Sequence, residues 1–296
     1  MHADQVDVSA DVVAALVAAQ FPRWRAHPVR PVVSHGTVNA LFRVGEEIVL
    51  RFPLQPSLDP ELRDALVREQ EIARRIAAHV PVAVPEPIAL GEPGEGYPGP
   101  WTAYRWITGD SADGLDVGAS AEFARDLAGF VRSLHRMATD GRTWGGQGRG
   151  GPLHTRDEYV RAALAGSSHL TDTVRLARIW ERCLDTPPHA AADVWIHADL
   201  MPGNLLVRDG RLAAVIDLGA VNVGDPAVDL MPGWNLMTSG ARDTYRRALG
   251  VDDATWERGR GWAIVQAIGA LPYYVDTNPV MADTARRTLD AVLADG

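Results

Sequence analysis

The sequence has little of several features that would each point to a particular class of protein. It contains one cysteine among 296 residues, so no disulfide can form within the chain. Cys183 lies in the helical stretch RIWERCL, where a core position is favoured over a reactive thiol. The apolar run 12–19 is too short to cross a bilayer, and the acidic N-terminus lacks the basic start of a signal peptide. We therefore expect a cytoplasmic protein without a membrane partner.

Positive charge is outnumbered by negative charge, with 29 basic residues against 38 acidic ones. The formal net charge is -9 at pH 7, with an isoelectric point near 5.5. A duplex nucleic-acid binder needs concentrated basic residues to displace counterions, so we expect no nucleic-acid partner. Residues 141–151, GRTWGGQGRGG, superficially resemble an RGG segment, but they are short and isolated in an acidic chain. A mobile surface loop near a substrate cleft is favoured for them over RNA binding.

The length, composition and hydrophobic pattern of the chain predict an α+β fold with two lobes. The chain is too long for one small core, and 46% hydrophobic with 23% charged residues is usual for a globular protein. An N-terminal lobe, residues 1–107, should hold an antiparallel sheet and one long helix, and a C-terminal lobe, residues 108–296, should be mostly helical. Strands are predicted at 28–36, 39–53 (with a turn at 45–47), 101–107 and 193–196, and helices at 58–79, 156–165, 170–184, 240–249, 254–275 and 279–294.

The stretch HADLMPGN, residues 197–204, carries the strongest chemical signal. It lies between two short apolar runs, and a hairpin turn at Asp209-Gly210 leads on to VIDLG, residues 215–219. The spacing H-x-D-x-x-x-x-N, followed by a strand and an aspartate, is the kinase catalytic-loop pattern. Each polar residue alone would be assigned to turn formation. Together they favour phosphoryl transfer, which needs a carboxylate to accept a proton and oxygen ligands for Mg²⁺.

The roles predicted within this pattern are distinct. Asp199 should point out of the loop to the acceptor, while Asn204 and Asp217 should face each other across the hairpin as metal ligands. His197 is expected to tie the loop to the strand before Asp217. Asp225 and Asp229, in GDPAVDL, are expected to serve as scaffolding, by capping the next segment and bonding the catalytic loop.

These motifs resemble a known family. WIHADLMPGNLLV, AVIDLG and VGDPAVDL are similar to the aminoglycoside phosphotransferase family of the protein-kinase-like fold, in a branch of bacterial antibiotic-kinase-like proteins, and the likeness runs nearly end to end. The resemblance implies a two-lobed kinase-like fold with ATP or GTP in the cleft, Mg²⁺, and phosphorylation of a small-molecule hydroxyl. It makes Asp199 the catalytic base and Asn204 and Asp217 the metal ligands.

The resemblance also implies a nucleotide site in the first lobe. Arg51 stands where kinase-like proteins usually carry a lysine; its planar fork can hold phosphate oxygens, although a solvated strand arginine is the alternative. Its acidic partner could be Glu61, Glu69 or Glu71. Glu69 is our choice, because it falls inside the apolar stripe of helix 58–79, where a carboxylate needs a partner. The remaining candidates are a phosphate loop at Ser34, His35, Gly36, Thr37 and Asn39, and purine contacts at Arg105, Trp106 and Ile107.

The acceptor remains open between several classes. An aminoglycoside-type antibiotic follows from the family likeness, with macrolides, other antibiotics, or choline-, homoserine- or sugar-like metabolites as alternatives. A nucleotide-binding pseudokinase is disfavoured, because Asp199, Asn204 and Asp217 are all retained. The region after residue 230 offers acids for ammonium groups (Asp243, Asp252, Asp253, Glu257, Asp276, Asp283) and large side chains for an apolar pocket (Trp234, Met237, Trp256, Trp262, Tyr273, Tyr274).

Overall fold

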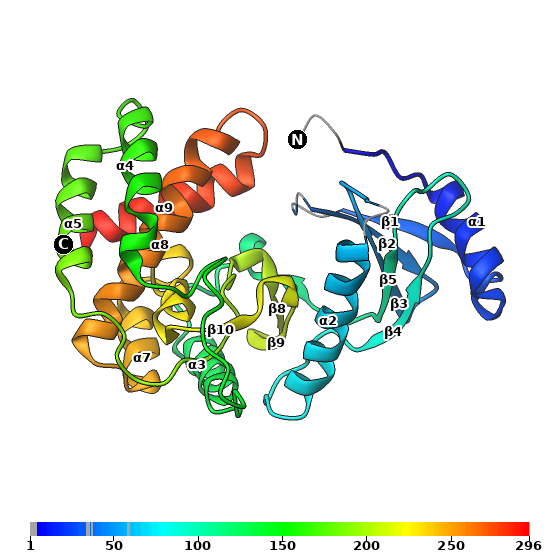
Figure 1. Ribbon diagram of the computed structural model, residues 1–296, viewed down its shortest axis with the longest axis horizontal. Coiled ribbons are helices and arrows are strands. Elements are labelled where there is room, and N and C mark those ends of the chain that lie inside the picture. The colour runs from blue at the N-terminus through cyan, green and yellow to red at the C-terminus, as the bar shows by residue number, and fades with distance from the viewer. Residues whose placement is uncertain (1–4, 34–35, 37, 58–59, 296) are drawn as a thin grey trace. The chain divides into compact units, whose positions relative to one another are not determined.

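The chain divides into two compact units (Figure 1). The computed structural model describes residues 5–33, 36, 38–57 and 60–295. The first unit comprises Met1–Ala78 and Ala83–Thr108, and the second comprises His79–Val82 and Gly109–Gly296.

The first unit is built on a five-stranded antiparallel sheet of order β1-β2-β3-β5-β4. Gly45, at φ +59°, makes the predicted hairpin turn between β2 and β3. Strand β4 was not predicted; it carries a proline and a glycine and lies at the edge of the sheet, where such residues are tolerated. The strands are β1 Val29–Val32, β2 Asn39–Val44, β3 Ile48–Pro53, β4 Pro87–Gly91 and β5 Trp101–Arg105.

Two helices, α1 (Ala10–Gln20) and α2 (Pro60–Ala77), accompany this sheet. Ser9 caps α1, since its side chain accepts the N–H of Val12 at 3.3 Å. The apolar side of α1 joins a core that includes Leu50, Phe52 and Trp101. Helix α2 buries an apolar stripe, and its Gln70 donates 2.9 Å to the carbonyl of Ala89 in β4.

The second unit is mostly helical, with two small antiparallel sheets. One has the order β6-β8-β9 and the other pairs β10 with β7. The strands are β6 Asp110–Ser111, β7 Val194–Ile196, β8 Leu205–Arg208, β9 Arg211–Val215 and β10 Asn222–Gly224. The helices are α3 Ala121–His135, α4 Asp157–Gly166, α5 Thr173–Asp185, α6 Pro232–Asn235, α7 Ser239–Leu249, α8 Asp253–Tyr274 and α9 Pro279–Ala294.

Helix α8 is the central element of the second unit. It is buried on nearly every side and packs against α4, α5 and α9, with which it lies side by side in Figure 1. Its Arg258 forms a buried ion pair with Asp225, at 2.7 Å. Four of the large side chains considered for an acceptor pocket are core residues instead, namely Trp234, Met237, Trp256 and Trp262. None of the helices in the described ranges combines the length and apolar character that crossing a membrane requires.

Candidate active site

The predicted catalytic loop, residues 197–204, joins β7 to β8. The N–H of Met201 donates to the carbonyl of Asp199 at 2.8 Å, and the N–H of Asn204 donates to the carbonyl of Met201 at 2.9 Å. Pro202 begins the single 3₁₀ turn Pro202–Asn204, where its fixed φ and missing N–H are tolerated. Two successive tight turns therefore set the distance between Asp199 and Asn204.

Asp229 holds the start of this loop from the interior. Its carboxylate is fully buried and accepts the backbone N–H of His197 at 3.0 Å and that of Ala198 at 2.9 Å. Nε2 of His135 lies 3.0 Å from the same carboxylate. These contacts support Ala198 at φ +65°, a conformation that an alanine adopts only under constraint. The scaffolding role predicted for Asp229 is confirmed.

Substituting Asp229 tests how much this clamp stabilises the fold. Asp229→Ala leaves two buried backbone donors and His135 without their acceptor, so we expect the free energy of unfolding to fall by about 3–5 kcal/mol. Urea unfolding followed by tryptophan fluorescence measures it. The control is Asp283→Ala, which breaks an ion pair with Arg286 that is exposed on both sides and should cost about 1 kcal/mol or less. Equal losses in the two variants would show that Asp229 has no special role.

His197 ties the loop to the neighbouring strand, as predicted. The ring is fully buried, with Nε2 3.2 Å from the carbonyl of Ile216, and Nδ1 accepts the N–H of Asp199 at 3.3 Å. This pattern assigns the ring proton to Nε2. Since both ring nitrogens are engaged, His197 is placed to orient the loop and not to act as a base.

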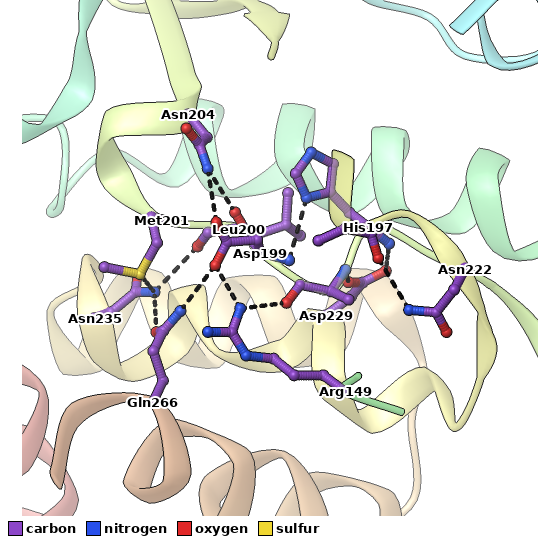
Figure 2. A network of polar contacts seen from close by, with 12 residues as sticks. Arg149, His197, Asp199, Leu200, Met201, Asn204, Asn222, Asp229, Asn235 and Gln266 are labelled. Carbon is purple, nitrogen blue, oxygen red and sulfur yellow. Dashed lines mark hydrogen bonds and ion pairs between the residues drawn. The ribbon is translucent and has the colours of Figure 1, made fainter. Parts of the chain in front are cut away.

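Asp199 lies at the centre of a polar network (Figure 2). Its Oδ2 accepts the side-chain amide of Asn204 at 3.2 Å. Its Oδ1 accepts Nη1 of Arg149 at 2.5 Å and lies 3.5 Å from Nε2 of Gln266. The side chain is 26% exposed, so the carboxylate is oriented by the protein and still reachable. A carboxylate in this state is chemically suited to accept a proton from a hydroxyl.

Asn204 directly precedes the first strand of the β8–β9 hairpin, and Asp217 follows its second strand. Leu205 pairs with Val215, and the N–H of Ile216 donates 2.9 Å to the carbonyl of Asn204, which places residues 204 and 217 at the same end of the hairpin. The Asn204 amide nitrogen faces Asp199, so the amide oxygen points away from the Asp199 carboxylate (Figure 2). Asp217 is in the left-handed region at φ +62°, which aspartate tolerates better than most residues.

These oxygen donors fit a magnesium ion that is completed by phosphates and water. Within the described part of the chain, no group of three or more His, Cys, Asp or Glu side chains is gathered that could hold a metal by itself. Mg²⁺ typically uses one or two carboxylates together with substrate phosphates, and rarely a full protein cage. Asn204 and Asp217 match that mode in number and in chemistry.

In the first unit, Arg51 and Glu69 form the ion pair expected from the sequence. Both side chains are largely buried, at 15% and 10% exposure, whereas Glu71 is exposed. Burial, followed by the charge of Glu69, raises the pKa of the neighbouring Tyr104, so that phenol stays protonated. All 29 basic residues counted as lysine or arginine are arginine. An arginine in place of a lysine at position 51 is therefore in keeping with a chain that contains no lysine.

Comparison with known proteins identifies the family. A model of the phosphotransferase enzyme family matches residues 30–262. The chain belongs to this family. It is therefore an enzyme of the phosphotransferase class, and the resemblance drawn from the catalytic-loop motifs is confirmed. No curated protein matches the chain.

Solved phosphotransferase structures share the fold. APH(2")-IIia in complex with GDP and kanamycin is 19% identical, covers 96% of this chain and 99% of its own, and superposes with a TM-score of 0.71. Aminoglycoside 2'-phosphotransferase-IIIa with GDP is 17% identical, with 98% and 100% coverage and a TM-score of 0.71. Macrolide 2'-phosphotransferase MphH from Brachybacterium faecium is 21% identical, with 95% and 97% coverage and a TM-score of 0.63. The predicted two-lobed kinase-like fold class is confirmed.

Part of the nucleotide site expected in this phosphotransferase lies outside the described residues, namely Ser34, His35 and Thr37. Gly36 is exposed, and Asn39 begins β2 opposite Pro53.

The three purine-contact candidates lie at the end of β5. The backbone N–H of Arg105 donates to the carbonyl of Glu86 at 2.9 Å, and that of Trp106 donates to the carbonyl of Glu47 at 2.7 Å. The Arg105 side chain pairs with the same two glutamates, and Arg43 stacks on the Trp106 ring. These two backbone donors are therefore used within the first unit.

Two polar contacts of Asp199, from Arg149 and Gln266, were not predicted from the sequence. Arg149 belongs to the glycine-rich stretch, and its signal was an arginine flanked by glycines at 148 and 150. Gln266 is a polar residue in the otherwise apolar run WAIVQAIGAL of α8. Both residues stand out in the sequence, but the sequence does not indicate which group either side chain contacts.

Proposed function

We propose that this phosphotransferase moves the γ-phosphoryl group of ATP or GTP to a hydroxyl of a small molecule, with Mg²⁺ as cofactor. The observation that carries the proposal is the Asp199 carboxylate, held between Asn204 on one oxygen and Arg149 on the other while still partly exposed. The nucleotide-bound relatives named above support a nucleotide as donor. Use of a nucleoside triphosphate also supports the cytoplasmic location expected from the sequence.

In the proposed reaction, Asp199 is the general base. The acceptor oxygen forms a bond to the γ-phosphorus as the bond from that phosphorus to the β–γ bridging oxygen breaks. The acceptor proton passes to the Asp199 carboxylate, and the nucleoside diphosphate leaves with the electron pair of the broken bond. Positioning of the reactants and neutralisation of charge supply most of the rate in this class of reaction.

Asn204 and Asp217 would hold the metal, which neutralises phosphate charge when it is bound. In the first unit, the guanidinium of Arg51, oriented by Glu69, would bind phosphate oxygens. Ser34 to Asn39 would cover the phosphates, and the 105–107 segment would meet the purine. We accordingly assign nucleotide binding to a domain of residues 1–107, and catalysis with acceptor binding to residues 108–296.

An aminoglycoside-type antibiotic is the first candidate acceptor, supported by the family and by the kanamycin-bound relative. A macrolide-type acceptor is the second. It is supported by the MphH relative and by the guanidinium of Arg149 beside Asp199, since a fixed positive charge favours an acceptor with fewer ammonium groups.

A screen for nucleoside diphosphate release tests the proposal. Purified protein is given ATP or GTP with Mg²⁺ and, in parallel, aminoglycosides, macrolides, other antibiotics and simple amino alcohols. We expect release that depends on at least one acceptor, with the phosphorylated product visible by mass spectrometry. Absence of acceptor-dependent release across the panel would count against an antibiotic acceptor, and failure to bind either nucleotide with Mg²⁺ would overturn the proposed function.

A further inference from the structure

The side chain of Arg149 contacts the candidate base and the residue before it. Nη1 donates to the carbonyl of Ala198 at 2.8 Å and to Oδ1 of Asp199 at 2.5 Å, and Figure 2 shows the guanidinium directed at both. The two side chains are 33% and 26% exposed. Arg149 therefore binds the carbonyl of Ala198 while Asp229 binds its N–H, so both backbone polar groups of this constrained residue are held.

The backbone beside Arg149 is built into the fold. Gly150 is at φ +106°, and a Cβ on it would come 2.5 Å from Cδ1 of Ile196, the last residue of β7. Its carbonyl accepts the N–H of Asp225 at 2.8 Å, just after β10. Only glycine suits such a close approach with a positive φ. The glycine-rich segment 144–151 is thus seated against the two strands that lead into and follow the active-site hairpin.

The rest of this segment is anchored as well. The backbone N–H of Trp144 donates to Asp193 at 2.8 Å, and its indole donates to the carbonyl of Gln147 at 2.8 Å. The guanidinium of Arg156 donates to the carbonyl of Gly148. The backbone is therefore anchored both before and after Arg149, which fixes the position of its Cα beside Asp199.

The catalytic loop itself has no lysine or arginine that could orient the Asp199 carboxylate. Its sequence from Asp199 to Asn204 is DLMPGN, which contains neither lysine nor arginine. Without Arg149, the carboxylate would keep Asn204 on Oδ2 and the long 3.5 Å contact with Gln266 on Oδ1, and it would regain freedom to rotate about its terminal torsion, because sp²-terminated torsions are broad. The charge-assisted bond from Arg149 to Oδ1 restricts this rotation, so the carboxylate presents a fixed orientation to the acceptor hydroxyl.

We propose that Arg149 is a positioning residue for Asp199, delivered to the catalytic loop by the glycine-rich segment 144–151. The inference rests on the proposed function, since it assigns Arg149 a role only through the base. Arg149 orients the carboxylate through Oδ1 and supports the backbone that carries it through the carbonyl of Ala198.

Arg149→Met, which keeps most of the apolar stem, is the test variant. We expect kcat to fall about 10- to 100-fold, because the base is misplaced, with the nucleotide KM within about twofold of wild type. Arg149→Lys should recover part of kcat, since lysine keeps a charge and one donor. Millimolar guanidinium chloride should partly restore Arg149→Ala and leave the wild type unchanged. Turnover is measured as diphosphate release with Mg²⁺-ATP or Mg²⁺-GTP and an acceptor found in the screen, or with water as acceptor.

The matched control is Arg142→Ala. Arg142 lies in the same glycine-rich region, but its guanidinium stacks on the Trp195 ring, 5.4 Å from the centroid, and it should keep kcat near wild type. An Arg149→Met enzyme with unchanged or raised kcat would overturn the inference and leave the proposed function standing, and so would equal losses in the two variants. A wild-type enzyme without turnover of any kind would instead remove the proposed function and this inference with it.

Discussion

Replacing Asp199 with asparagine should lower kcat by about 10²–10⁴-fold, the usual contribution of a positioned general base. Asparagine keeps the shape of the side chain but has one acceptor oxygen, so it can accept a hydrogen bond from Arg149 or from Asn204 but not from both, and it cannot accept the acceptor proton. Because neither the fold nor the metal ligands change, binding of Mg²⁺-ATP or Mg²⁺-GTP should persist. Steady-state diphosphate release gives kcat, and titration calorimetry gives the nucleotide affinity of the same preparation.

The matched control removes a carboxylate from the neighbouring hairpin without touching the base. Asp209 is in the left-handed region at φ +54° at the β8–β9 turn, a conformation that asparagine also tolerates. Asp209→Asn should therefore keep both kcat and nucleotide affinity. Turnover at the wild-type rate by Asp199→Asn, with any acceptor, would rule out Asp199 as the base.

Features encoded over a few consecutive residues could be predicted from the sequence. The turns at Gly45 and at Asp209-Gly210 depend on left-handed backbone that few residues adopt, so their positions were evident. Helix α9 was predicted with the bounds that the structure shows, from an amphipathic period over many residues. The pairing of Glu69 with Arg51 followed from a charge inside an apolar stripe, because a buried carboxylate needs a partner.

Features that depend on distant partners could not be predicted in this way. Strands β6 and β10 are two and three residues long, too short to show an alternating pattern, and they exist because β8 and β7 lie beside them. The contact of Arg149 with Asp199 spans 50 positions and depends on how Gly150 packs against β7. A single sequence shows that an arginine lies among glycines, but it does not show which carboxylate that arginine meets.

Removing the carboxylate of Asp217 should abolish the part of nucleotide affinity that depends on magnesium. We compare Kd for ATP and GTP with Mg²⁺ and with EDTA by titration calorimetry, without an acceptor. In the wild type Mg²⁺ should tighten binding, and in Asp217→Asn this advantage should shrink about 10- to 100-fold or vanish, because an amide replaces the charged ligand. Metal-independent binding through Arg51 should survive.

The backbone at Asp217 decides which substitutions can be interpreted. At φ +62°, alanine would add strain of its own, whereas asparagine and glycine tolerate this region. Asp217→Gly removes the carboxylate and relaxes the backbone, whereas Asp217→Asn removes the charge and keeps an oxygen. If both variants lose the effect of magnesium on nucleotide affinity, the carboxylate is the group responsible for that effect. If magnesium still tightened nucleotide binding in both variants as it does in the wild type, the metal would have to lie elsewhere. The assignment of Asn204 as a metal ligand would then fail together with that of Asp217, because both residues lie at the same end of the β8–β9 hairpin.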